Sequence, residues 1–238
     1  MIKAINTWVV SLFRYTAATT DWRKEEIMKL DQRTRKLLTM HKAHHPKDSV
    51  HRLYISRKEG GRGLISIENC VEIATVGLEN YIQNSTERLI IAARGEDKES
   101  TESVNNVKQR IKRNRKAELK EKKLHGQFLR DIEEVADEKT WNWMKNGHLK
   151  RETESLIIAA QDQAIRTNAI KAKIDKTRDD SMCRMCNAQD ETITHIISEC
   201  PKLAQKEYKR RHGWMDKAIH WDLCRKKGFA TTDKWYEH

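Results

Sequence analysis

Apolar side chains recur along this chain at the three- and four-residue spacing that is typical of amphipathic helices. Only two prolines and nine glycines occur, which argues against a sandwich or barrel with many turns. The pattern therefore predicts an all-α fold in which each helix buries one face. Helices are expected over residues 3–18, 22–41, 66–94 and 149–175, of which the first is expected to be buried and the last is the most clearly amphipathic.

The residues at the predicted helix ends agree with this pattern. Asp21 is a candidate N-cap for the second helix, and Ser66 is a candidate N-cap for the third. Gly95 follows the third helix at the position where a left-handed residue commonly ends a helix. From Gly228 onward the chain is polar, and this tail is expected to fray.

The stretch 53–64 interrupts the helical pattern and contains three glycines. Glycine permits positive φ and close backbone approach, so the stretch is predicted to be a loop. Arg57, Lys58 and Arg62 surround the glycines, and a basic loop of this kind can hold a phosphate group. An ordinary turn has the same composition, so both interpretations stay open.

The composition adds a strong charge bias to this picture. The formal net charge is +12, and the sequence pI is about 9.5. Such an excess attracts phosphate backbones or acidic membrane surfaces. No run of 18 or more apolar residues occurs, and the first residues lack the layout of a signal peptide, so no membrane segment is expected.

Much of the positive charge lies in the middle of the chain. Residues 96–106 are polar and acidic and are predicted to be a linker, whereas residues 108–123 are dominated by lysine and arginine. The basic stretch has a sparse apolar stripe, so an isolated helix there is at most marginally stable. Lys112, Arg113 and Arg115 are candidate phosphate contacts. A solvated charged helix and a nuclear-localisation run are the alternatives.

Two further features have candidate roles in nucleic-acid binding. Trp141 and Trp143 can stack on bases, although wedging between helices is the favoured interpretation. A second basic run, which includes Lys209, Arg210 and Arg211, precedes a predicted helix that carries two more tryptophans. These three cations are also candidate phosphate contacts.

The clearest chemical pattern is C-x2-C-x8-H-x4-C near the end of the chain. It comprises Cys183, Cys186, His195 and Cys200. Three thiolates and one imidazole form the closed ligand set of a structural Zn²⁺ site, and the two-residue gap allows a turn to direct the first two thiols at one point. The isoleucines within residues 191–199 recur at helical spacing, so a helix is predicted there. Such a helix can direct His195 and Cys200 toward the first two thiols. The alternative is a set of unrelated buried cysteines.

The remaining cysteines, Cys70 and Cys224, are expected to be free thiols, which fits an intracellular protein, nuclear or cytoplasmic. Four histidines between residues 41 and 51 are interpreted as loop residues rather than as a second metal site. The sequence shows no phosphate loop, no nucleophile elbow and no pair of aspartates in a strand-turn context. The chain is therefore not expected to be an enzyme by itself.

Three segments resemble the C-terminal part of a non-LTR (LINE-type) retrotransposon reverse transcriptase. KAINTWVVSLFRYTA, at 3–17, resembles the helix that follows the polymerase palm and opens the thumb region. LYISRKEGGRGLISIE, at 53–68, resembles a glycine-rich basic loop and helix start further along. The stretch 167–212 resembles the helix and cysteine–histidine knuckle near the end of that family, and the order of the three segments matches.

The resemblance implies a nucleic-acid-binding fragment that holds RNA or a template-primer duplex, with the polymerase palm expected upstream or in a separately encoded chain. It assigns the zinc ligands to the four residues of the C-x2-C-x8-H-x4-C pattern. A zinc-pinned protein-interaction module and a truncated retroelement copy without a function of its own remain alternatives. The implied organisation is a thumb-like helical region at 1–95, a polar linker and basic helix at 96–136, a helical module at 137–228 with its knuckle at 183–200, and a tail at 229–238.

Overall fold

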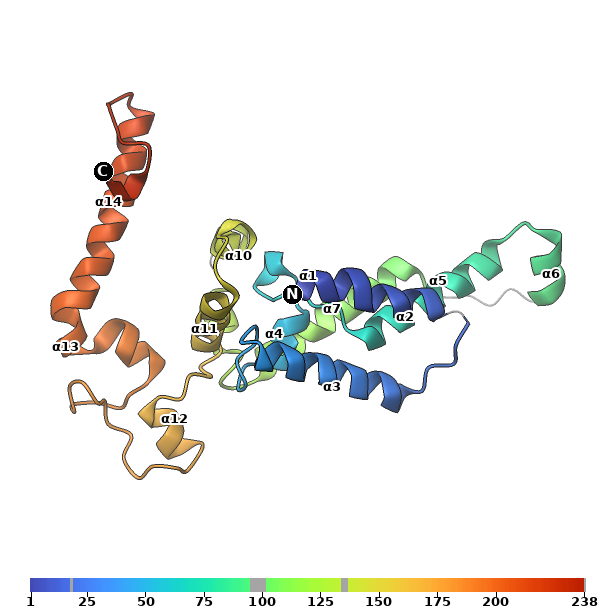
Figure 1. Cartoon of the computed structure of the whole chain (residues 1–238), viewed down its shortest axis with the longest axis horizontal. Helices are drawn as coiled ribbons and strands as arrows, with labels where there is room; N and C mark the ends of the chain where they lie inside the picture. The colour runs from blue at the N-terminus through green and yellow to red at the C-terminus, as the bar shows by residue number, and fades with distance from the viewer. Residues whose placement is uncertain (18, 95–101, 134–136, 238) are drawn as a thin grey trace. The chain divides into compact units, whose positions relative to one another are not determined.

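The computed structural model describes residues 1–17, 19–94, 102–133 and 137–237, and Figure 1 traces them. Every regular secondary-structure element in these ranges is a helix, so the predicted all-α class is confirmed. A single isolated β-bridge joins Met182 and Asp190. Within the same ranges, every helix is too short or too polar to cross a membrane. The chain divides into two compact units, Met1–Ala164 and Ile165–His238.

The first unit begins with a helix that is more exposed than its sequence predicts. α1 (Ile2–Ala4), a π-helical turn (Ile5–Val9) and α2 (Val10–Thr16) follow one another without leaving helical backbone angles. Val10 is the one residue of these three elements that is fully buried. The expectation of a buried helix over 3–18 is therefore wrong for most of its apolar residues, which include Trp8, Leu12 and Tyr15 on the exposed side.

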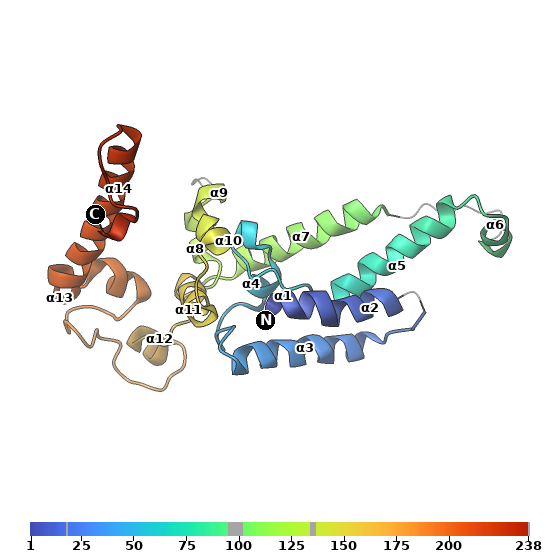
Figure 2. The same cartoon turned by 45° about the horizontal axis from the view of Figure 1, so that its top comes forward.

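α3 (Lys24–Met40) and α5 (Ile67–Asn84) are joined by a buried carboxylate. α3 starts after Arg23 rather than after the predicted cap Asp21, and its N-cap makes no side-chain hydrogen bond. Asp31 of α3 accepts hydrogen bonds from the Ser66 hydroxyl (2.8 Å) and from the Ile67 amide (3.1 Å). α2, α3 and α7 (Val104–Glu121) all pack against α5, and Figure 2 shows α5 between α2 and α7.

The predicted helix from Ser66 to Arg94 is interrupted. Ser66 does cap α5, because its hydroxyl accepts a hydrogen bond from the Asn69 amide. Ser85 then adopts an extended conformation and accepts a hydrogen bond from the Glu87 amide, and α6 (Arg88–Arg94) begins beyond this turn. Serine and threonine side chains favour such local turns over a continuous helix. Gly95, the predicted helix end, lies outside the described residues.

The main apolar core of the first unit joins segments that are far apart in sequence. α4 (Val50–Tyr54) leads to a 3₁₀ turn (Arg57–Glu59), and the later elements are α8 (Gln127–Asp131), α9 (Asp137–Thr140), α10 (Asn142–Asn146) and α11 (Arg151–Gln161). Trp141 lies in their midst with 2% of its surface exposed, which confirms that it wedges between helices. Its ring also fills the space beside Gly60, where an added Cβ would lie 2.5 Å from the indole.

The helix predicted over 149–175 is two helices. α11 ends at Gln161, and α12 (Asn168–Lys173) begins after Thr167, whose hydroxyl caps it by accepting from the Ile170 amide at 3.3 Å. Between them Gln163 has a φ of 52° and Asp162 is buried. The division between the two units falls in this break, so residues 137–164 belong with the first unit and not, as predicted, with the knuckle.

The second unit ends in one long helical rod. α13 (Pro201–Leu203), a π-helical turn (Ala204–Tyr208) and α14 (Lys209–Lys226) follow one another directly. The tail folds back along α14: the Trp221 indole donates to the Thr232 carbonyl at 2.8 Å, and Trp235 meets Trp214 at 5.4 Å between ring centroids. The expectation of a frayed tail is therefore wrong up to Glu237, the last described residue, and Figure 1 shows the tail beside α14.

Candidate metal centre and basic surfaces

The four predicted zinc ligands come together in the second unit. One ligand atom each from Cys183, Cys186, His195 and Cys200 lies within 4.8 Å of all the others. Cys183 and Cys200 are fully buried, His195 is 1% exposed, and Cys186 is partly exposed. Among the residues that the structure describes, no other group of histidines, cysteines and carboxylates has this geometry.

A tight turn directs the first two thiols toward the cluster. The Asn187 amide donates to the Cys183 carbonyl at 2.9 Å, and Asn187 takes a left-handed φ of 51°. The Cys183 amide donates to the Gln189 carbonyl at 2.8 Å, which closes the loop behind the turn. The Met185 amide lies 3.4 Å from Cys183 Sγ and can donate to it. A donor at that distance stabilises a thiolate, the form of cysteine that binds metals.

The imidazole of His195 is held in the tautomer that a metal ligand needs. Its Nδ1 lies 3.1 Å from Gln189 Oε1, and its Nε2 lies 3.3 Å from Cys186 Sγ. The amide oxygen of glutamine accepts hydrogen bonds and cannot donate them, so Nδ1 carries the proton. The lone pair of Nε2 then faces the three sulfurs, which is the usual outer-shell arrangement around a histidine ligand.

Tyr208 ties Cys200 and the knuckle helix, a π-helical turn at His195–Glu199, to the long rod. The phenol oxygen accepts from the Cys200 amide at 3.0 Å and lies 3.0 Å from the Ile196 carbonyl, to which it can donate. The Cys200 amide also donates to the His195 carbonyl at 2.8 Å. Pro201 then opens the rod at a position where a missing amide hydrogen costs little. The last ligand is thus fixed from both sides.

A buried carboxylate fastens the knuckle to α12. Glu191 accepts hydrogen bonds from the Asn168 amide, the Arg184 amide and Arg184 Nε, at 2.7–3.0 Å. The hydrogen bonds from the Arg184 side chain are the main reason that the pKa of Glu191 falls to about 2. Glu191 therefore stays ionised across the physiological range and holds the two segments together.

The donor set and its geometry fit Zn²⁺. A tetrahedral ion with sulfur ligands at about 2.3 Å and nitrogen at about 2.0 Å places neighbouring ligand atoms roughly 3.5–3.8 Å apart. The observed upper limit of 4.8 Å requires only a small inward movement of the side chains. Three sulfurs and one nitrogen are the ligands that zinc prefers, and four protein ligands leave no open position for catalysis.

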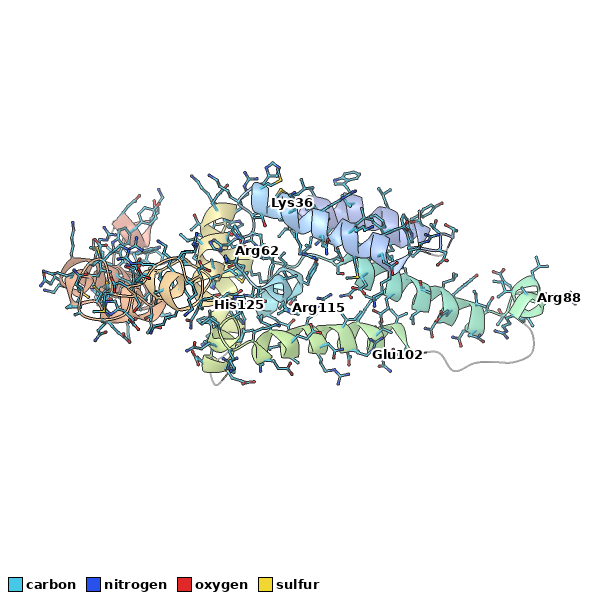
Figure 3. All side chains as sticks on the ribbon, turned by 90° about the horizontal axis from the view of Figure 1, so that it is seen from below. Lys36, Arg62, Arg88, Glu102, Arg115 and His125 are labelled. Atoms are coloured by element: carbon cyan, nitrogen blue, oxygen red, sulfur yellow. The ribbon has the colours of Figure 1, made fainter. Side chains whose placement is uncertain are left out.

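The two arginines of the predicted phosphate loop are engaged within the protein. Arg57 donates to both carboxylate oxygens of Glu154, at 2.7 and 2.9 Å, and Arg62 Nε lies 2.9 Å from the same carboxylate. The Arg62 side chain is 6% exposed, and it is labelled in Figure 3. Arg57 and Arg62 share the single carboxylate of Glu154, which leaves one positive charge in excess, so their contact with an external phosphate stays a prediction. Lys58 remains exposed.

The predicted contacts on α7 divide into exposed and engaged cations. Lys112 and Arg113 are exposed, and Lys112 lies 3.2 Å from Glu59 in a surface ion pair. Arg115 lies over the ring of Tyr54 in α4, at 4.9 Å from the ring centroid, and Figure 3 shows it on the side of α7 that faces the other helices of the first unit. Arg115 therefore supports packing, whereas the other two are accessible.

The predicted cations of the second unit, Lys209, Arg210 and Arg211, are all exposed on α14. Arg210 pairs with Glu207 at 2.8 Å. Arg211 donates to the Ile197 carbonyl at 3.0 Å and lies over the Tyr208 ring at 5.1 Å. The three cations thus lie directly after the knuckle, and one of them is anchored to it.

Sequence reasoning missed the residues that orient the ligands. Gln189 and Tyr208 show no periodicity or motif of their own, and only their positions six residues before His195 and eight after Cys200 could have suggested a supporting role. No protein-family model, no curated protein and no solved structure matches this chain.

Proposed function

We propose that this chain is an intracellular nucleic-acid-binding protein, the C-terminal part of a non-LTR retrotransposon reverse transcriptase, in which Zn²⁺ has a structural role. RNA or a template-primer duplex is its ligand, and the polymerase palm belongs to another segment or another chain. The binding contacts are made mainly to phosphate, so the binding is weakly sequence-specific.

The observation that carries this proposal is the packed basic helix α7. Its 18 residues include seven lysines and arginines and two glutamates. Val107 and Leu119 are fully buried, so α7 packs against the rest of the first unit. This packing stabilises a helix that its sequence alone predicts to be only marginally stable. Lys108, Lys112 and Arg113 are exposed. A phosphate backbone can therefore bind these cations without first having to order the helix that carries them.

The metal supports this function indirectly. Binding energy at a structural zinc site is folding energy for the segment around it. In the second unit that segment holds Arg211 through Ile197, and it leads directly into the basic start of α14. Zinc therefore orders a second cationic surface that an unfolded knuckle would not present.

A protein-interaction module is a second candidate, favoured by one observation. Trp8, Leu12 and Tyr15 are exposed on one side of the N-terminal helix, with 66–86% of their surfaces accessible. Large exposed apolar side chains mark contacts with other proteins more often than contacts with phosphate. This candidate gives α7 only the role of keeping the chain in solution.

The test is the salt dependence of binding to a single-stranded RNA and to a duplex of the same length. We expect the logarithm of the association constant to fall linearly with the logarithm of salt concentration. Replacing Lys108, Lys112 and Arg113 with glutamine should reduce the slope by up to about two, roughly 0.7 for each lost contact to a single strand.

The matched control removes three exposed cations at similar spacing from α3, namely Lys29, Arg33 and Lys36. Both triple variants change the net charge equally, so only the position of the charge differs. We expect the α3 variant to keep most of the slope. A flat salt response of the unaltered chain, or equal losses in the two variants, would contradict the assignment to α7.

A further inference from the structure

The second unit contains a groove of about 610 Å³ that no part of the metal site occupies. It lies between the knuckle helix, α14 and the folded-back tail. This volume is within the roughly 300–1,000 Å³ that is common for pockets that bind small ligands. The groove therefore has room for one unpaired base and part of its sugar.

Aromatic rings form much of the wall of this groove. Tyr208, Trp214 and Trp235 line it, and the two indoles meet at 5.4 Å with an angle of 80° between their planes. About half of the Trp214 surface is exposed. Met215 and Ile197, which are also about half exposed, supply the apolar remainder. A flat apolar ring that enters this corner can stack on one indole and touch the other.

A cation without an acidic partner stands at the rim. Arg211 donates to the Ile197 carbonyl and lies over Tyr208, and it contacts no carboxylate among the described residues. The one acidic residue of the groove, Glu207, is neutralised by Arg210 at 2.8 Å. The rim therefore keeps a net positive charge beside aromatic walls.

We propose that this groove binds an unpaired nucleobase of a single-stranded nucleic acid, with Arg211 contacting the adjoining phosphate. Aromatic stacking with a cation beside it is the arrangement by which proteins hold single strands without reading their sequence. A base inside a duplex cannot enter, because both of its faces are already stacked. This inference rests on the proposed function and narrows it to a single-stranded ligand at this unit.

The groove depends on the knuckle for its shape. Tyr208 contacts the Ile196 carbonyl, and Arg211 donates to the Ile197 carbonyl, so two of its walls are fastened to the helix that carries His195. Loss of the metal should therefore remove base binding even though α14 itself remains helical. Zinc and base binding are coupled through these two backbone contacts.

The experiment compares two strands of equal length and charge on the zinc-loaded full chain, one with all its bases and one with a central run of abasic sites. We expect the complete strand to bind about 5- to 150-fold more tightly, the range that base–aromatic stacking gives. Trp214→Ala should remove that preference, and Trp214→Phe should keep part of it. RNA and DNA versions of both strands show which sugar is accepted.

Trp8→Ala is the control, since Trp8 is an exposed tryptophan of the first unit. It should keep the preference for the complete strand. Equal binding of both strands to the unaltered chain, with a steep salt slope, would overturn the base site and leave phosphate binding intact. A preference that survives Trp214→Ala would also overturn it, because the base would then lie elsewhere. Failure of both strands to bind at low salt would overturn the proposed function itself.

Discussion

The two units differ in what fills their interiors. The first buries two clusters of apolar side chains, one around Trp141 and one around Leu38 and Leu53. In the described part of the second unit, Ala169 is the only fully buried apolar residue besides the cysteines of the cluster. Its other buried residues are polar: Thr167, Asn168, Glu191 and His195.

This difference implies two sources of stability within one chain. Apolar burial stabilises a unit in proportion to the area removed from water. A unit with almost no such area needs another source, and small domains commonly use a metal for it. The first unit should therefore respond to changes in packing, whereas the second should respond to changes in its ligands.

The largest effect is expected from removing one of the four proposed zinc ligands. Cys183→Ser replaces a fully buried thiol with a much weaker ligand, and structural zinc binding is worth about 10–16 kcal/mol in zinc-finger peptides. We expect loss of bound zinc and rapid proteolysis beyond residue 164, while the unfolding transition of the first unit stays unchanged. Zinc stoichiometry and limited proteolysis measure the two outcomes.

Cys224→Ser provides the matched control, because Cys224 is a free cysteine of the same unit outside the cluster. It should retain one zinc ion per chain and the proteolysis pattern of the unaltered protein. If Cys183→Ser also kept its zinc, the ligand assignment would be wrong. If the second unit resisted proteolysis without zinc, the contrast between the two interiors would be wrong.

The next effect tests the first unit. Trp141→Ala removes a ring that packs against Phe128 at 5.9 Å and lies beneath Arg52 at 5.0 Å. A large-to-small change of this kind costs about 3–5 kcal/mol of unfolding free energy. Denaturant unfolding measures the loss, which should leave zinc content unchanged. Trp8→Ala, at a site 74% exposed, should shift the stability by only about 0.5 kcal/mol.

Local signals in the sequence predicted the parts of the structure that depend on neighbouring residues. The ligand spacing from Cys183 to Cys200 lies within 18 residues, so a turn and a short helix suffice to close it. Ser66 could be recognised as a cap because its partner, the Asn69 amide, is three residues away. The wedged position of Trp141 followed from the general preference of indoles for helix interfaces.

Long-range contacts explain what the sequence could not predict. Arg57 and Glu154 are 97 residues apart, and no local pattern indicates that the carboxylate would occupy the basic loop. A second contact of this kind lies at the break after Gln161, where the Ser49 amide donates to the buried Asp162 from 113 residues away. Both contacts join partners that only the fold brings together.

Acidic groups extend the comparison between the units. In the second unit, Arg184 lowers the pKa of the buried Glu191. In the first unit, burial raises the pKa of Asp48 to about 8 and that of Asp162 to about 6, and the charge of Asp162 raises the pKa of Asp48 further. Burial lowers the pKa of the neighbouring His44 to about 4, with Asp48 Oδ2 3.7 Å from its Nδ1. At pH 7 the buried Asp48 of the first unit is therefore neutral, whereas the buried Glu191 of the second unit is ion-paired.

The smallest expected effect follows from Asp48. Its folded pKa exceeds the unfolded value near 3.9, so the folded state binds the proton more tightly and loses stability as pH rises toward 8. His44 has the opposite effect, but mainly below pH 6.5, where its unfolded form is protonated. Between pH 6.5 and 8, Asp48 by itself should make unfolding of the first unit easier by about 1–2 kcal/mol. Burial also lowers the pKa values of His45, His51 and His125, and these three imidazoles, like His44, offset part of that loss.

Denaturant unfolding at several pH values, monitored by a signal from the first unit, measures how its unfolding free energy changes with pH. Asp48→Asn keeps a neutral side chain of the same shape, so it should flatten the slope between pH 6.5 and 8. Asp21→Asn changes an exposed aspartate of the same unit and should leave the slope unchanged. If Asp48→Asn left the pH dependence of stability unchanged over this window, Asp48 would have to be ionised when folded. Arg52 and Arg62 would then have to compensate its charge, and the contrast with the ion-paired Glu191 would disappear.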